Sequence, residues 1–84
     1  MSDNLEEVRL TPEQLERLGK YLYGTSFKIQ LADSLGVDRR RINHWLDGDR
    51  PIPVGITVEL LEIAKKRTTE IAEAVHQLEK ILKS

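Results

Sequence analysis

The chain has 84 residues, enough for one compact domain with an appendage but too few for two independent cores. It has no cysteine and no apolar run near the roughly 18 residues of a membrane span, so we expect neither disulfides, thiolate metal sites nor membrane insertion. The net charge is −1, but residues 20–67 hold nine basic residues against six acidic ones, which indicates a locally positive surface.

Residues 1–10 are predicted to form a flexible, acidic N-terminal segment. Its first seven residues lack the basic start and apolar core of a signal peptide, so we expect a cytoplasmic protein. No period-two alternation continues long enough to predict a strand. The sequence therefore predicts an all-α fold of about four helices.

The first helix is predicted to begin at Thr11. A threonine cap, Pro12 at the first helical position and Gln14 three residues after the cap form a typical helix start. Gly24 can take the left-handed conformation that ends this helix. The apolar stripe of the helix comprises Leu15, Leu18 and Leu22.

Two shorter helices are expected next. Either Thr25 or Ser26 can cap the second helix, which should run to about Leu35. Gly36 then provides a turn, and the carboxylate of Asp38 can accept the free amide hydrogens at the start of the third helix. That third helix is expected to end near residues 47–48.

A long C-terminal helix is predicted from about Pro53. Leu60, Leu61 and Ala64 are expected to close the small core. A kink near residues 68–69, or packing of the tail onto the other subunit's domain, is an open alternative to a coiled coil. Apolar and small side chains recur at alternating spacings of three and four, the heptad pattern of a coiled-coil seam. The seam residues are Leu61, Ala64, Thr68, Ile71, Val75, Leu78 and Leu82.

The segment 28–47 satisfies the constraints of a helix-turn-helix. Two short helices that cross steeply need a small residue at their contact, a residue that tolerates positive φ in the turn, and apolar side chains on both inner faces. Ala32 meets the first requirement and Gly36 the second. The inner apolar positions are filled by Leu31, Leu35, Val37, Ile42 and Trp45.

This segment and, more loosely, residues 11–64 resemble the helix-turn-helix family of phage repressors and Cro-like regulators. The resemblance implies that the first turn of the motif's second helix points into the major groove of double-stranded DNA, where arginine can donate two hydrogen bonds to guanine. The candidate residues for reading bases are Arg39, Arg40, Asn43 and His44. The candidate residues for contacting phosphates are Ser26, Lys28, Arg41 and Arg50.

Residues 65–84 form the predicted dimerisation tail. Ile71, Val75, Leu78 and Leu82 project beyond any core that this chain could build, and an apolar stripe of that length normally finds a partner. Because helix-turn-helix proteins commonly read two half-sites, we expect a homodimer that binds a palindromic operator.

Catalytic and metal sites are not expected. The two histidines, His44 and His76, are 32 residues apart in sequence and have no further ligands at suitable spacing, and no nucleophile is paired with a base. We expect no enzymatic activity, no cofactor and no small-molecule ligand.

The sequence thus predicts a dimeric repressor of a phage or mobile-element operon, similar to those that control anti-CRISPR genes. Two alternatives stay open at this point. An antitoxin would use the same DNA-binding domain and carry a helix that neutralises a toxin. A protein-interaction module would keep the helix-turn-helix only as a scaffold and bind its partner through the C-terminal helix.

Overall fold

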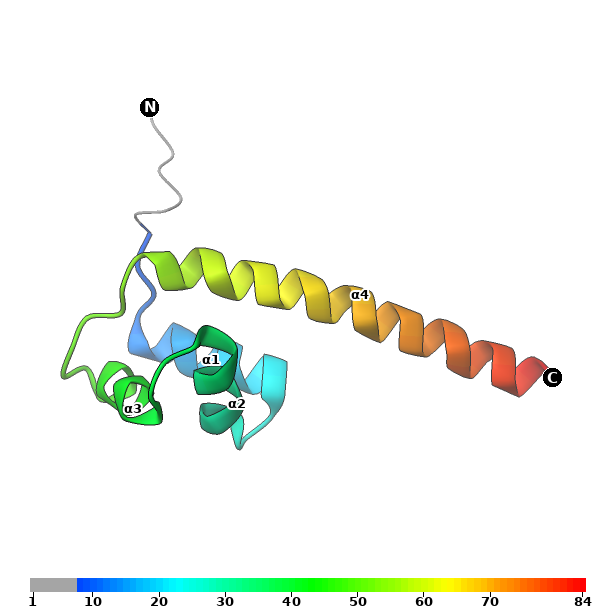
Figure 1. Cartoon of the computed structure of the whole chain (residues 1–84), viewed down its shortest axis with the longest axis horizontal. Helices are drawn as coiled ribbons and strands as arrows, with labels where there is room; N and C mark the ends of the chain where they lie inside the picture. Colours follow the sequence, from blue (N-terminus) through cyan, green and yellow to red (C-terminus); the bar gives the residue numbers. More distant parts are fainter. Residues whose placement is uncertain (1–7) are drawn as a thin grey trace, which may run out of the picture.

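The computed structural model describes residues 8–84, and this part of the chain is all-helical (Figure 1). No strand occurs among these residues, which confirms the predicted fold class. Most of the predicted N-terminal segment, residues 1–7, lies outside the described residues. The four helices are α1 (Pro12–Tyr23), α2 (Phe27–Leu35), α3 (Arg39–Asp47) and α4 (Gly55–Lys83).

Helix starts follow the capping signals of the sequence. The Thr11 hydroxyl accepts the Gln14 amide at 3.1 Å, and the Gln14 side chain accepts the Thr11 amide at 3.0 Å, which completes the predicted capping box. The Asp38 carboxylate accepts the Arg40 amide at 3.0 Å and so caps α3 as predicted. Ser26, rather than Thr25, is the N-cap residue of α2, and its side chain makes no capping hydrogen bond.

The same type of turn ends both helices of the predicted motif. After α2, Gly36 adopts the left-handed conformation and the Val37 amide reaches back to the Ala32 carbonyl at 3.0 Å. After α3, Gly48 repeats this geometry. The expectation for Gly24 is only partly correct: its φ of 82° is positive, but its ψ of −166° lies outside the left-handed helical region.

The core lies where α1, α2, α3 and the first two turns of α4 meet, and only apolar side chains are buried in it. Phe27 and Ile52, whose burial was not predicted, both belong to this core. The expectation that Leu61 closes the core is wrong, because its side chain is 50% exposed. The buried apolar residues are Leu15, Phe27, Leu31, Ala32, Leu35, Ile42, Trp45, Ile52, Ile56 and Leu60.

A buried glycine sets the distance between α1 and α2. Gly19 lies in the middle of α1, where a Cβ atom would come within 2.8 Å of Cε2 and 2.9 Å of Cγ of the Phe27 ring, and closer still to Cδ2. Because that ring is itself buried, it has little room to move aside. The close approach of the two helices therefore requires glycine at position 19.

We expect Gly19→Ala to destabilise the domain by about 1 to 3 kcal/mol, because overlap with Phe27 outweighs the gain of about 1 kcal/mol in helix propensity. Gly55→Ala is the matched control, since Gly55 begins α4 with open space around its Cα. The control should unfold at the same temperature as the parent or slightly higher. Thermal unfolding followed by circular dichroism measures both, and equal stabilisation by the two changes would contradict the proposed contact.

Helix α4 is one continuous element of 29 residues, so the alternative of a kink near residues 68–69 is wrong. The hydroxyls of Thr68 and Thr69 donate to the carbonyls of Ala64 and Lys65, which lets both threonines stay within the helix. The Arg67 guanidinium lies 5.1 Å from the centre of the Tyr23 ring and joins α4 to α1. From position 68 onward every residue is exposed, and the helix extends away from the other three (Figure 1).

A membrane span is absent from the described part of the chain. Within residues 8–84, no helix combines the length and the apolar character needed to cross a bilayer.

Candidate nucleic-acid interface

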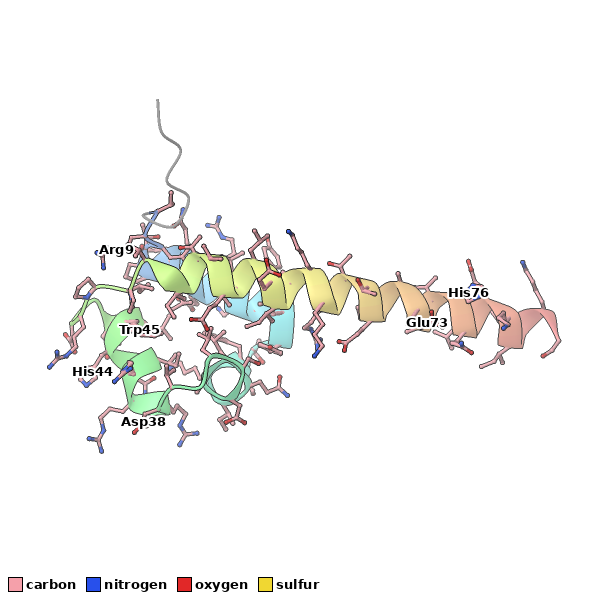
Figure 2. All side chains as sticks on the ribbon, turned by 45° about the horizontal axis from the view of Figure 1, so that its top comes forward. Arg9, Asp38, His44, Trp45, Glu73 and His76 are labelled. Atoms are coloured by element: carbon pink, nitrogen blue, oxygen red, sulfur yellow. The ribbon has the colours of Figure 1, made fainter. Side chains whose placement is uncertain are left out.

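Helix α3 is attached to the domain along one side only. Ile42 and Trp45 are buried, and Leu46 packs partly against the same core. Figure 2 shows Trp45 between α3 and α4, with His44 on the outer side of α3 and Asp38 at the edge of the molecule away from α4. The remaining side of α3 is therefore available to an external partner.

The exposed side of α3 begins with three consecutive arginines. Arg39, Arg40 and Arg41 occupy the first turn of the helix, and all three are exposed, as is Asn43 one turn later. Within residues 8–84, Lys20 pairs with Glu16 and the His44 ring lies near Asp49, and no acidic side chain forms an ion pair with these arginines.

The position of these arginines works against the stability of the isolated helix. The first turn of a helix carries a partial positive charge, where cations are unfavourable by roughly 0.3 to 1 kcal/mol each. The Asp38 carboxylate offsets one part of this cost. Residues that lower the stability of their own helix occur mainly at functional sites. The stability of the fold therefore gives no reason for three arginines at residues 39–41.

His44 has an acidic neighbour that the sequence analysis missed. Its ring is partly exposed, and Nδ1 lies 3.6 Å from a carboxylate oxygen of Asp49. The turn after Gly48 produces this contact, because the Asp49 amide donates to the His44 carbonyl at 3.0 Å. The signal available in the sequence was the spacing of five residues between His44 and Asp49, with Gly48, the glycine that ends α3, between them. The arginine-rich end of α3 therefore carries the stronger positive charge.

The predicted phosphate contacts come from both sides of α3. Ser26 and Lys28 are exposed at the start of α2, and the Ser26 hydroxyl is not engaged in capping. Phe27, between them, is buried and anchors this end of α2. Arg50 is exposed in the loop that follows α3, where its amide approaches the His44 carbonyl at 3.4 Å. The predicted contacts are thus distributed over α2, α3 and the next loop.

Within residues 8–84, no cluster of three or more histidine or acidic side chains is arranged to bind a metal ion. The described part of the chain also has no buried side-chain nitrogen or oxygen without a hydrogen-bond partner. Among the described residues, the polar and charged side chains therefore lie at the surface or partly exposed.

The predicted dimerisation residues lie together on the free part of α4. Ile71, Val75, Leu78 and Leu82 are between 49% and 85% exposed, and we refer to them as the α4 stripe. At its N-terminal end this stripe leads to an apolar groove of about 690 Å³ between α1 and α4, which the sequence analysis did not predict. The residues that line this α1/α4 groove include Leu18, Tyr21, Leu22, Leu60, Leu61 and Ala64.

No family model, curated protein or solved structure matches this chain.

Proposed function

We propose that the protein is a sequence-specific regulator of transcription that binds double-stranded DNA as a homodimer in the cytoplasm and represses a promoter by occupying it. The observation that carries this proposal is the first turn of α3, where three exposed arginines follow the Asp38 cap while Ile42 and Trp45 hold the helix in the core. This arrangement presents positive charge and hydrogen-bond donors on a rigid element.

The exposed side chains of α3 have the donors that base recognition needs. An arginine can donate two hydrogen bonds to O6 and N7 of guanine, which discriminates against a wrong base by roughly 1 to 3 kcal/mol. We assign this role to Arg39 and Arg40, with Asn43 and His44 reading neighbouring base edges. Ser26, Lys28, Arg41 and Arg50 would fix the position of the domain by contacting phosphates.

Two copies would allow the protein to recognise a palindrome. Recognition helices related by twofold symmetry enter successive major grooves when they are separated by one turn of DNA, about 34 to 36 Å, or by a multiple of it. The exposed α4 stripe supports this part of the proposal, because it offers an apolar surface on which two copies can associate.

The proposal is tested by a binding titration against random duplex DNA at several salt concentrations. A protein that neutralises phosphates must bind with a steep inverse dependence on salt, with a slope of about −0.9 per phosphate contacted. Lys28→Ala should weaken binding to every sequence and reduce the magnitude of that slope by about one unit.

Lys83→Ala is the matched control, because it removes the same charge from the far end of α4 and should leave the slope unchanged. No binding to DNA even at low salt would refute the proposal and favour the protein-interaction module.

A further inference from the structure

The α1/α4 groove and the α4 stripe follow one another along the seam positions of α4, with Thr68 between them. Leu61 and Ala64 line the groove, and the heptad positions then continue through Thr68 to the stripe. Seven consecutive seam positions therefore lie along one side of α4: Leu61 lies in the groove, the small residues Ala64 and Thr68 follow it, and four large residues occupy the free half. The surface is asymmetric along its length.

The sizes of the seam residues are complementary when two α4 helices run in opposite directions. The spacings of the seam make Leu61, Thr68, Val75 and Leu82 its a positions and Ala64, Ile71 and Leu78 its d positions. In an antiparallel coiled coil, each a position packs in a layer with a d position of the other helix. The register that keeps the whole stripe paired packs Ala64 with Leu82 of the partner subunit, Thr68 with the partner's Leu78, and Ile71 with the partner's Val75. Each small residue then faces a large one. A parallel pair would instead set alanine against alanine and threonine against threonine, which leaves voids.

The charges beside the seam favour the same direction. Lys65 and Glu79 both flank the seam on its e side and are exposed. In the antiparallel register Lys65 lies next to the partner's Glu79 at each end of the pair. In a parallel pair the flanking neighbours would be Arg67 with the partner's Ala72 and Ala74 with the partner's Glu79, so no ion pair would form.

We propose that α4 pairs antiparallel with α4 of a second copy, so that the last turn of each helix enters the end of the α1/α4 groove of the other that Ala64 lines. This inference rests on the homodimer of the proposed function but not on DNA binding. Leu82 of the partner subunit reaches the level of Ala64, where Leu18 and Tyr21 provide the far wall of the groove. Each domain is thereby in contact with the tail of the other copy.

Disulfide trapping tests the direction of pairing, and the absence of natural cysteines removes background. Thr68→Cys and Leu78→Cys alter exposed positions outside the core, so both variants should fold. The two variants, one enlarged by a peptide tag, are mixed and oxidised without DNA. We expect a disulfide in the mixed pair only, because Thr68 would lie about 15 Å along the axis from the partner's Thr68, beyond the reach of a disulfide.

Self-linked dimers of each variant would indicate parallel pairing and overturn the proposal, as would the absence of any linked species together with a monomer in sedimentation at micromolar concentration. Mixed linkage in a protein that does not bind random duplex DNA would refute the proposed function and leave this pairing intact. The two failures are thus distinguishable.

Charge reversal provides a second, independent test. Lys65→Glu or Glu79→Lys alone should weaken dimerisation by about 3- to 30-fold, because each creates like-charged neighbours at both ends of the pair. The double variant Lys65→Glu/Glu79→Lys should restore the parent dissociation constant in sedimentation. Additive weakening in the double variant would contradict the antiparallel register.

Discussion

Replacing Ile42 with alanine should remove a large share of the domain's free energy of unfolding. The Ile42 side chain is 0% exposed and lies at the contact of α3 with the rest of the core. Truncating a buried isoleucine costs about 2 to 5 kcal/mol, whereas a chain of this length has a total stability of roughly 4 to 12 kcal/mol. The midpoint of thermal unfolding should fall by about 10 °C or more.

Ile29→Ala is the matched control for this change. Ile29 lies in α2, within the same motif, but its side chain is 54% exposed. The same truncation there should change stability by less than about 0.5 kcal/mol. The single tryptophan, Trp45, is buried in this core, so its fluorescence reports unfolding of the motif directly. Equal losses of stability in the two variants would show that α3 is not held as described.

Arg40→Ala should lower affinity for the operator by about 10- to 100-fold per half-site while leaving the fold intact. The side chain is exposed in the first turn of α3, so its removal takes no atoms from the core. The expected loss corresponds to one bidentate contact with guanine. A selection of bound sequences from a random DNA pool first identifies the operator, and a titration then compares operator with random duplex.

Two comparisons make this result specific to base recognition. His44→Ala should also reduce operator preference, whereas Lys80→Ala, at the other end of the molecule on α4, should not. Affinity for random duplex should fall much less than affinity for the operator, because only the latter includes the base contact. An unchanged operator preference in both Arg40→Ala and His44→Ala would exclude these two residues from base readout.

Local chemistry explains why the helix boundaries could be predicted. A capping box at Thr11, a carboxylate cap at Asp38 and a left-handed glycine at Gly36 each depend on groups within a few residues, so the sequence contains the whole interaction. The inner positions of the motif were predictable for a related reason. Burial of Ala32 and Ile42 follows from the 3.6-residue period of two short helices.

Contacts between helices could not be predicted in the same way. The overlap of Gly19 with the Phe27 ring depends on how closely α1 approaches α2, which no local signal specifies. Leu61 has the hydrophobicity of a core residue, but α4 rotates it toward the groove, where it stays half exposed. The distance and angle between packed helices therefore determine whether such residues are buried, and no local feature of the sequence specifies them.

The exposure of a side chain likewise could be predicted only where the 3.6-residue period of a helix determines which way it points. The outward direction of Arg40 on α3 follows from the burial of Ile42 and Trp45 on the other side. The position of Asp49 beside His44 depends instead on the glycine turn that reverses the chain after α3. The contact between Asp49 and His44 was therefore not anticipated.

The division of α3 into a buried side and an exposed side has a consequence for how such a protein can diverge. Ile42 and Trp45 attach the helix, while Arg40 and Asn43 make no contribution to the buried core. Substitutions on the exposed side would thus be nearly neutral for folding, and surface changes of this kind usually alter stability by less than about 0.5 kcal/mol. Under the proposed function, descendants of one gene could acquire new operators through a few codons while inheriting an unchanged scaffold.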